Sequence, residues 1–224
     1  MHQRKSKKIL IYFFLLILVG SINNNSINNL RLEKVKKINI FGLDENDQKI
    51  LLYNLKNLDL KNIFFINKKS FQNIIENNSL IEDYNVIKKY PYSIDINIKK
   101  TNFIARINKN GMFFLVGSNG KLSNNINSKI QLPYIFGSPE IIRILELKKI
   151  IDQSNIDYSK IKSLYYFKSK RWDLEFNNNM VIKLPEKIEK EILNKISIFL
   201  KNIELENKKI IDARIKNQII ILDE

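Results

Sequence analysis

Apolar residues are most concentrated near the N-terminus, where residues 9–19 contain no charged side chain. Gly20, Ser21 and Ile22 extend this run, and an Asn-rich stretch follows at residues 23–29. A helix over residues 9–22 would be about 21 Å long, because an α-helix rises about 1.5 Å per residue. A bilayer core is about 30 Å thick, so spanning it requires flanking lysines to snorkel and the bilayer to thin.

The cationic residues before this run, Arg4, Lys5, Lys7 and Lys8, indicate an export signal or a membrane anchor in the positive-inside orientation. A cleaved signal peptide, with small residues at Val19-Gly20-Ser21, and a buried core helix are the alternatives. Both a membrane anchor and a cleaved signal peptide would place the bulk of the chain outside the cytoplasm. The anchor residues would be Ile9, Leu10, Ile11, Tyr12, Phe13, Phe14, Leu15, Leu16, Ile17, Leu18 and Val19.

The pattern after residue 34 predicts a small α+β unit. Weak alternation predicts a strand at residues 34–41, ending at Gly42. Asp44 is a plausible N-cap of a first helix, and Asn67 or Ser70 of a second. Strict alternation from residue 84 onward then predicts half-buried strands. The predicted order is therefore strand, helix, helix, strand, strand, ending near Arg106.

Two Asn-Gly pairs, at residues 110–111 and 119–120, bracket an apolar run at residues 112–116. GSNGK resembles part of a phosphate-binding loop, but Leu122 stands where such a loop needs Ser or Thr, and no helical pattern follows. Asn-Gly tolerates positive φ at both central positions of a type I′ turn. The stretch is therefore predicted to be two hairpin corners around one strand.

The remaining pattern predicts strands and two helices. One helix is expected to start with Ser138 as N-cap and Pro139 at its first helical position, and another at Pro185. Between them, strands at residues 161–167, 171–176 and 180–184, with Ser169-Lys170 in a turn, predict an antiparallel sheet. Two last strands are expected at residues 210–215 and 218–222, joined by residues 216–217. Trp172 is predicted to lie in the core.

Composition excludes most catalytic chemistry. The chain of 224 residues has no Cys, and its single His is His2. Thiolate and zinc sites, His general bases and His-based triads are therefore excluded. A hydrolase using Asp173 and Glu175 is disfavoured, because residues two apart on a strand share a face and are more simply solvated there. The net charge of +15 comes from scattered Lys and is read mainly as a genome composition bias.

Several strings, in order, resemble the FtsQ/DivIB family of bitopic bacterial division proteins. They are INIFGLDENDQKILLYNL, VIKKYPYSIDINIKKTNFIARIN, NGMFFLVGSNGKL, LPYIFGSPE, RWDLEFNNNMVIKLP and IIDARIKNQIIIL. The resemblance implies an α+β protein with a basic cytoplasmic tail (residues 1–8), an uncleaved transmembrane helix (9–22), a linker (23–34), a POTRA domain (35–100) and a β domain of antiparallel strands with two helices (101–224). The chain departs from the family at Lys100, Thr101 and Phe103, and at Ile215, where some members carry an aromatic residue.

The resemblance implies a non-enzymatic scaffold of the divisome that needs no cofactor. Its partners would be division proteins of the FtsB and FtsL type, with other division proteins bound through the POTRA domain and the anchor. It would lie in the inner membrane at the septum, with its bulk in the periplasm. The alternatives are an exported basic protein that binds nucleic acid or another anionic polymer, and an outer-membrane assembly protein, for whose barrel the chain has no room.

An open sheet edge is the device expected to bind these partners, because it offers unpaired backbone groups to an incoming strand. The resemblance places this edge at residues 210–215, with Arg214 free to bind a partner carboxylate, and adds the hairpin at residues 170–171. The pattern alone instead favours a core strand with Asp212 and Arg214 on its solvated face, because exposed charges usually blunt sheet edges. Pro at Ala213 is expected to abolish partner capture without unfolding the domain. The expected binding residues are Lys170, Arg171, Ile210, Ile211, Asp212, Ala213, Arg214 and Ile215.

Overall fold

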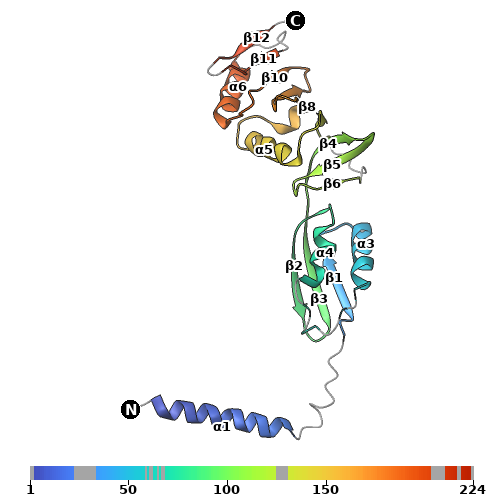
Figure 1. Cartoon of the computed structure of the whole chain (residues 1–224), viewed down its shortest axis with the longest axis vertical. Helices are drawn as coiled ribbons and strands as arrows, with labels where there is room; N and C mark the ends of the chain where they lie inside the picture. Colours follow the sequence, from blue (N-terminus) through green and yellow to red (C-terminus); the bar gives the residue numbers. More distant parts are fainter. Residues whose placement is uncertain are drawn as a thin grey trace.

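The computed structural model of the chain describes residues 3–22, 34–58, 60, 63–64, 66, 69–124, 131–202, 210–215 and 218–222. Figure 1 shows a helix and then two domains that follow one another, with the C-terminus at the far end of the second domain. The last strand of the first domain ends at Lys100, and the first strand of the second domain begins at Phe103. Both domains combine helices and strands, as the α+β class predicts.

The N-terminal helix, α1, covers Gln3–Ile22 and contains the predicted apolar run. The side chains of residues 9–19 are exposed to between 45% and 72% of their surface. They contribute to neither of the two hydrophobic cores formed by the described residues, so the alternative of a buried core helix is wrong. Across the described ranges, no helix has both the length and the apolar character required to cross a membrane.

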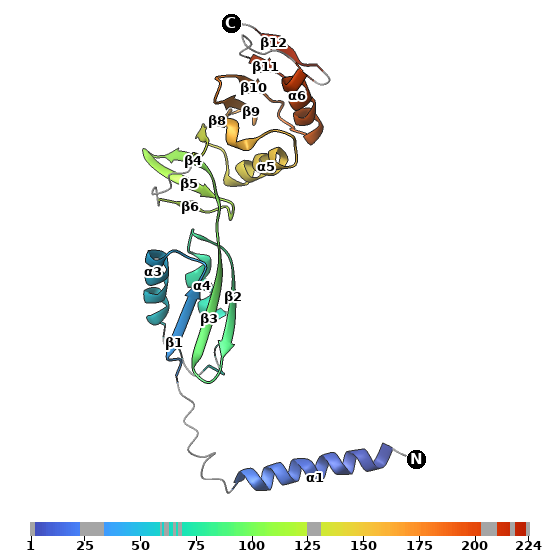
Figure 2. The same ribbon diagram turned by 180° about the vertical axis from the view of Figure 1, so that it is seen from behind.

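The first domain has the predicted succession of elements, which are β1 (Lys37–Phe41), α3 (Glu45–Lys56), α4 (Lys69–Glu76), β2 (Ile81–Lys89) and β3 (Ser93–Lys100). In its sheet, β3 lies between β1, to which it is parallel, and β2, to which it is antiparallel. Ile94, Ile96 and Ile98 alternate along β3 and are buried in one core with residues of both helices. The two helices therefore cover the same face of this sheet (Figures 1 and 2).

The second domain contains the strands β4 (Phe103–Lys109), β5 (Met112–Gly117), β6 (Leu122–Ser123), β7 (Tyr134–Phe136), β8 (Ile161–Tyr166), β9 (Trp172–Phe176), β10 (Val181–Lys183), β11 (Ile210–Asp212) and β12 (Ile220–Leu222), the helices α5 (Ile141–Asp152) and α6 (Lys190–Asn202), and the short 3-10 helix η1 (Tyr158–Lys160). In the described residues these strands form one sheet in the order β12-β11-β10-β9-β8-β7-β4-β5-β6. Both helices pack into the same core as Trp172, whose predicted burial is confirmed.

The prediction of a purely antiparallel β domain is wrong. The strands β8, β9 and β10 are antiparallel as expected, but the pairs β4·β7, β7·β8 and β10·β11 are parallel. Two of these pairs follow from the helices, because α5 connects β7 to β8 and α6 connects β10 to β11. A helical crossover brings the chain back to the same end of the sheet, so the strand that follows it runs in the same direction.

Three predicted helix starts differ from the structure. Ser138 does not cap α5, whose N-cap is Glu140 in an extended conformation, and α6 begins five residues after Pro185. Ser70 lies inside α4, and Asn67 lies outside the described residues. Asp44 does occupy the N-cap position of α3, but its carboxylate accepts a hydrogen bond from Lys100 and makes no side-chain cap. At Asp44, a tertiary contact with Lys100 thus takes the place of the expected side-chain cap.

The two Asn-Gly stretches form the predicted hairpin corners, β4–β5 and β5–β6. At the first corner, Asn110 and Gly111 have φ values of 52° and 81°, as a type I′ turn requires. At the second corner only Gly120 has a positive φ, and its N–H donates to the Gly117 carbonyl at 2.9 Å. The second corner is therefore a three-residue loop with Gly in the left-handed region, rather than a type I′ turn.

This second corner joins the two domains. The side-chain amide of Asn119 donates to the carbonyls of Ser79 (3.0 Å) and Ile81 (2.8 Å) in the first domain. Thr101, which lies between the domains and is 4% exposed, donates through its hydroxyl to Glu82 at 3.1 Å. The hydroxyl of Ser118 also donates to Glu82. The GSNGK stretch thus serves as a hydrogen-bonded contact between the domains.

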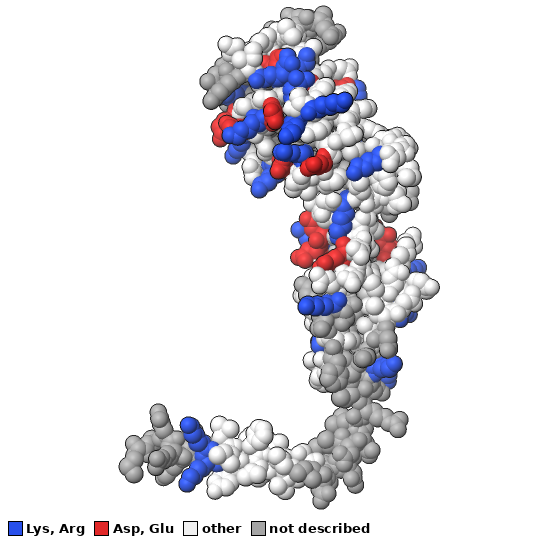
Figure 3. Space-filling model, in the orientation of Figure 1, with Lys and Arg blue, Asp and Glu red and all other residues white. Residues whose placement is uncertain are grey.

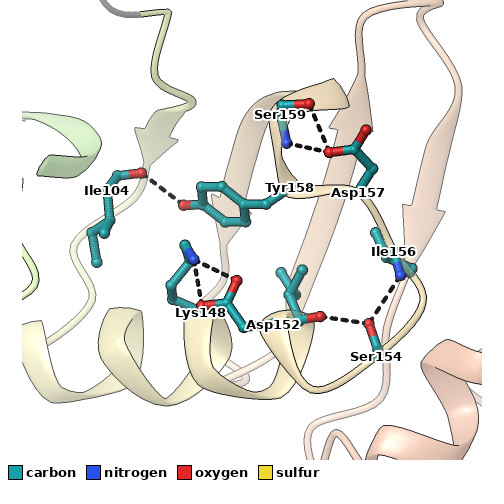
Figure 4. Close-up of polar contacts among 9 residues, drawn as sticks. Ile104, Lys148, Asp152, Ser154, Ile156, Asp157, Tyr158 and Ser159 are labelled. Carbon is teal, nitrogen blue, oxygen red and sulfur yellow. Dashed lines mark hydrogen bonds and ion pairs between the residues drawn. The ribbon is translucent and has the colours of Figure 1, made fainter. Parts of the chain in front are cut away.

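A second polar network holds α5 and η1 against the sheet, as Figure 4 shows. The β4–β5 register shifts between Phe103 and Ala105, and the carbonyl of the intervening Ile104 accepts a hydrogen bond from the Tyr158 hydroxyl at 2.8 Å. The Lys148 ammonium lies 4.5 Å from the centroid of the Tyr158 ring and pairs with Asp152. The Tyr158 hydroxyl thus bonds to the β4 backbone at the irregular point of the β4–β5 ladder.

Candidate functional site

The strand predicted to be an open edge, β11, is internal to the sheet. It pairs with β10 in parallel and with β12 in antiparallel orientation, so both of its flanks are occupied. The N–H of Ala213, next in the chain, donates to the Lys183 carbonyl at 2.9 Å. The predicted edge at residues 210–215 is therefore wrong. Pro at Ala213 would break this internal hydrogen bond and would not test an open edge.

The edge of the sheet on this side is β12. Within the described residues, β12 has β11 as its single neighbour, so its other flank faces away from the sheet. Ile220 and Leu222 are 40% and 44% exposed. They pair with Asp212 and Ile210 of β11, whereas Ile221 pairs with Ile211, which is buried in the core. Because successive side chains point to opposite faces of a strand, Ile220 and Leu222 lie on the face away from the core.

Arg214 is held by Asp212. Its Nε donates to the two carboxylate oxygens of Asp212 at 2.8 and 2.9 Å, and its Nη2 donates to the same carboxylate. The backbone N–H of Arg214 also donates to Asp212 at 3.0 Å. These bonds to the charged form, led by those from the side chain, lower the pKa of Asp212. Arg214 is therefore oriented by its neighbour, with 42% of its side chain exposed.

A row of charges runs across the sheet beside this pair. Lys183 of β10 lies opposite Asp173 of β9 on one side and opposite Asp212 of β11 on the other. Asp173 is only 6% exposed, so the expectation of a solvated carboxylate is wrong. Burial raises its pKa, and the positive charges of Arg171, Lys183 and Arg214 offset this only in part. The positive charges of Arg171 and Arg214 thus both stabilise the ionised form of the buried Asp173 carboxylate.

Lys170 and Arg171 lie in the β8–β9 corner, as predicted. Lys170 adopts a φ of 59°, and the N–H of Phe167 donates to the Arg171 carbonyl at 3.0 Å to close the turn. The Arg171 guanidinium lies 4.5 Å from the Phe167 ring centroid and 3.4 Å from the Asp173 carboxylate. Lys170 instead lines a cavity of about 390 Å³ beside α5. The structure therefore brings Arg171 toward the Arg214 group but places Lys170 elsewhere.

A cavity of about 450 Å³ lies between α6 and the segment that joins β11 to β12. Three predicted binding residues line it, Ala213, Arg214 and Ile215, together with residues that the sequence did not single out. The described lining residues are Pro185, Lys187, Glu189, Glu191, Ile192, Lys195, Ala213, Arg214, Ile215, Gln218 and Ile219. The β12 residues could have been found from the predicted hairpin, because a strand joined by a tight turn pairs with its predecessor and takes its place at the edge.

The fold is that of a two-domain protein in which a β-α-α-β-β module precedes a mixed β domain. The family described as "Cell division protein FtsQ/DivIB, C-terminal" matches residues 105–214, and "POTRA domain, FtsQ-type" matches residues 33–100. The chain belongs to the FtsQ/DivIB family of bacterial cell division proteins.

Relatives that carry the name of this family are similar to most of the chain. The protein "Cell division protein FtsQ" of Rickettsia bellii (strain RML369-C) is 28% identical over 191 residues, covering 84% of this chain and 72% of the relative. The protein of the same description from Rickettsia conorii (strain ATCC VR-613 / Malish 7) is 28% identical over 195 residues, with the same coverage. The major extracytoplasmic domain of the division protein DivIB from Geobacillus stearothermophilus aligns at 14% identity and a TM-score of 0.32, over 46% of this chain and 88% of that chain.

Proposed function

We propose that the chain is a non-enzymatic, single-pass membrane protein of the bacterial division machinery that recruits partners of the FtsB and FtsL type. Membership of a cell-division family supports a role in bacterial cell division. In the part of the chain that the structure describes, the outer flank of β12 has no partner strand, which supports binding by strand addition, because an unpaired strand edge can bind a strand of another protein. Family membership also argues against the alternative of an exported protein that binds anionic polymers.

The apolar part of α1 is the proposed anchor. Its side chains are exposed on all sides of the helix, which is unfavourable in water and favourable in lipid. Lys7 and Lys8 precede it and would remain at the cytoplasmic surface, in agreement with the positive-inside rule. Both domains would then lie in the periplasm, at the septum of the inner membrane.

The partner strand is proposed to extend the sheet beyond β12. Its backbone would pair with the outer flank of β12, and its apolar side chains would contact Ile220 and Leu222. Arg214 is exposed beside this edge, and its guanidinium has five N–H donors, of which Nε and Nη2 point to Asp212. A partner carboxylate is therefore expected to approach Arg214 from the cavity that Ile215 and α6 line. Arg171 offers a second cation at the β8–β9 corner.

Capture of identified partners tests this proposal. The double variant Ile220→Lys, Leu222→Lys places charges on the edge, which natural edge strands use to prevent strand addition. Tagged full-length protein is purified from its membranes, and the co-purifying FtsB- and FtsL-type proteins are quantified by mass spectrometry. Capture is expected to fall at least tenfold, which corresponds to about 1.4 kcal/mol.

The matched control is Met112→Lys, at an exposed position of β5 far from β12 along the sheet. It is expected to retain partner capture, and both variants are expected to unfold at the same temperature as the parent. Undiminished capture by a folded Ile220→Lys, Leu222→Lys protein would show that partners do not bind through β12.

A further inference from the structure

Three aromatic side chains are exposed at the end of the POTRA domain where the chain enters it. Tyr90 and Tyr92 lie at the tip of the β2–β3 hairpin and are 59% and 40% exposed, and Phe64 is 56% exposed. The rings of Phe64 and Tyr90 are in contact, with centroids 5.0 Å apart. The N–H of Lys36, just before β1, donates to the Tyr92 carbonyl at 2.9 Å. The first strand and the hairpin tip therefore lie side by side at this end (Figure 1).

Two lysine side chains lie beside these rings. The Lys36 ammonium lies 5.4 Å from the Tyr92 ring centroid, and the Lys88 ammonium donates to the Phe64 carbonyl at 3.5 Å. The stretches 34–41 and 86–95 contain five lysines and one carboxylate, that of Asp95, which pairs with Lys89 at 2.7 Å. On the face seen in Figure 3, the acidic side chains of this domain lie toward the β domain, whereas basic side chains lie along its length and also at the opposite end. We call Phe64, Tyr90, Tyr92, Lys36 and Lys88 the hairpin-tip patch.

The rings of Phe64, Tyr90 and Tyr92 are not part of the hydrophobic core of the domain. The buried residues of β2 and β3 face α3 and α4, whereas Tyr90 and Tyr92 lie beyond the last paired residues of the hairpin, Lys89 and Ser93. Aromatic rings and lysines that lie together on a surface match the interfacial layer of a bilayer, where rings settle at headgroup level. Lysines are attracted there by the negative potential of anionic lipids.

The chain length keeps this patch near the anchor. The helix α1 ends at Ile22, and the described part of the POTRA domain begins at Lys34. The connecting stretch can extend to at most about 43 Å, because a fully extended chain covers at most about 3.6 Å per residue. The patch lies at the end of the domain that receives this stretch (Figure 2). It can therefore reach the bilayer that would hold α1.

We propose that the hairpin-tip patch binds the anionic phospholipid surface of the membrane in which α1 is anchored. This inference rests on the proposed anchoring of α1. The rings of Phe64, Tyr90 and Tyr92 lie among the headgroups, and Lys36 and Lys88 lie against their phosphates. The contact fixes the POTRA domain at the membrane and projects the β domain, with its β12 edge, away from the surface.

The absence of Cys allows a site-specific test in the full chain, because each introduced Cys is the only one to be labelled. Three Ser→Cys variants carry the same thiol-reactive fluorophore: Ser21→Cys at the end of α1, Ser93→Cys beside the hairpin tip and Ser138→Cys on the exposed surface of the β domain. Each is reconstituted in vesicles of phosphatidylcholine with or without phosphatidylglycerol. The readout is quenching by lipids that carry a nitroxide on the headgroup.

The Ser93 label is expected to be quenched at least about twofold more than the Ser138 label in vesicles with phosphatidylglycerol, and less without it. Lys36→Gln, Lys88→Gln in the Ser93→Cys background is expected to remove most of this excess. Equal quenching of the Ser93 and Ser138 labels, together with quenching of the Ser21 label, would contradict membrane binding by the hairpin-tip patch. The same result would still support the anchoring of α1. Quenching at Ser93 that is independent of phosphatidylglycerol would overturn the assignment to anionic lipid. An unquenched Ser21 label would instead overturn the proposed anchoring.

Discussion

Gly42 and Gly111 both have a left-handed backbone, with φ values of 95° and 81°, but their surroundings differ. A Cβ on Gly42 would lie 1.9 Å from the carbonyl oxygen of Ile98, whereas a Cβ on Gly111 would have no atom within 4 Å. Gly42 therefore permits both the turn after β1 and the close approach of that turn to β3. Gly111 permits only the turn.

Replacement of each glycine by Ala separates these two effects. Gly111→Ala is expected to lower the free energy of unfolding by about 1 kcal/mol, the usual cost of a left-handed backbone at a residue with Cβ. Gly42→Ala adds a backbone overlap and is expected to cost about 3 kcal/mol or more. Denaturant titration of both variants measures the difference. Equal losses would mean that the contact with Ile98 relaxes without cost.

Arg214 shows how an adjacent residue decides what a binding side chain can do. The sequence suggests a free guanidinium for a partner carboxylate, whereas in the structure Asp212, two residues earlier, accepts from Nε and Nη2. The ion pair holds the guanidinium in one orientation. A partner can therefore bind it without the entropic cost of ordering a flexible side chain. Arg214 is thus proposed to bind through its remaining donors.

At the scale of elements, Tyr158 fixes the crossover that makes β7 and β8 parallel. Its hydroxyl bonds to Ile104 of β4, while its ring lies beneath Lys148 of α5. One side chain of η1 therefore joins a helix to the strand that begins the domain (Figure 4). Burial, with a smaller contribution from the charge of Asp152, raises the pKa of Tyr158.

Tyr158→Phe is expected to lower the free energy of unfolding by about 1 to 2 kcal/mol, because it removes the hydroxyl that donates to the Ile104 carbonyl. The pKa of Tyr158 in the folded chain lies above the unfolded value of about 10, so its contribution to stability is complete below pH 10 and is lost as the pH rises toward the folded pKa. The variant is therefore expected to lose less stability between neutral and alkaline pH than the parent. Denaturant titrations across this range measure both effects.

Tyr53→Phe is the matched control, since Tyr53 on α3 is 68% exposed. It is expected to change stability by less than about 0.5 kcal/mol, as surface substitutions usually do. A Tyr158→Phe protein with the same alkaline loss of stability as the parent would contradict the assigned role.

At the scale of the whole molecule, the two domains are held together by the β5–β6 corner. Asn119 donates two hydrogen bonds to carbonyls of the first domain, and the hydroxyls of Thr101 and Ser118 both donate to the Glu82 carboxylate. The Lys121 ammonium also donates to the Glu76 carbonyl. These contacts fix the angle between the POTRA domain, which is proposed to lie on the membrane, and the sheet that carries β12.

Asn119→Ala and Asn119→Asp are expected to loosen this junction, the second more strongly, because it places a carboxylate against two carbonyl oxygens. Spin labels at Tyr53→Cys and Met112→Cys, one on each domain, give the distance distribution between the domains. Each Asn119 variant is expected to widen the distribution clearly and to cost about 1 kcal/mol for each lost hydrogen bond. Asn108→Ala, which removes an acceptor of the Gly111 N–H within the β4–β5 corner, is the control and is expected to leave the distribution narrow. Equal widths in all variants would show that other contacts hold the domains.

The sequence patterns that predicted the structure correctly are those that are compatible with a single type of local structure. Alternation at Ile94, Ile96 and Ile98 predicts a half-buried strand, and β3 is one. Asn110-Gly111 predicts a type I′ corner from backbone preference alone, and the corner is present. Capping residues were less informative: Ser138 and Ser70 belong to a residue type that caps helices well, but α5 has Glu140 at its N-cap and Ser70 lies inside α4.

The sequence by itself determined the succession of elements in the first domain, both helices and most strands of the second domain, the exclusion of Cys and His chemistry and the apolar run of α1, because these depend on composition and on neighbours along the chain. It predicted neither β7 nor η1, and it placed the end of the first domain near Arg106, within β4. Only the tertiary structure decided that β11 is internal and β12 is the edge, that Asp212 holds Arg214, and that Asn119 joins the domains. Strand order and partner choice depend on contacts between residues that lie far apart in the sequence. A local pattern gives the direction in which a side chain points, but it does not show which strand, carboxylate or carbonyl lies there.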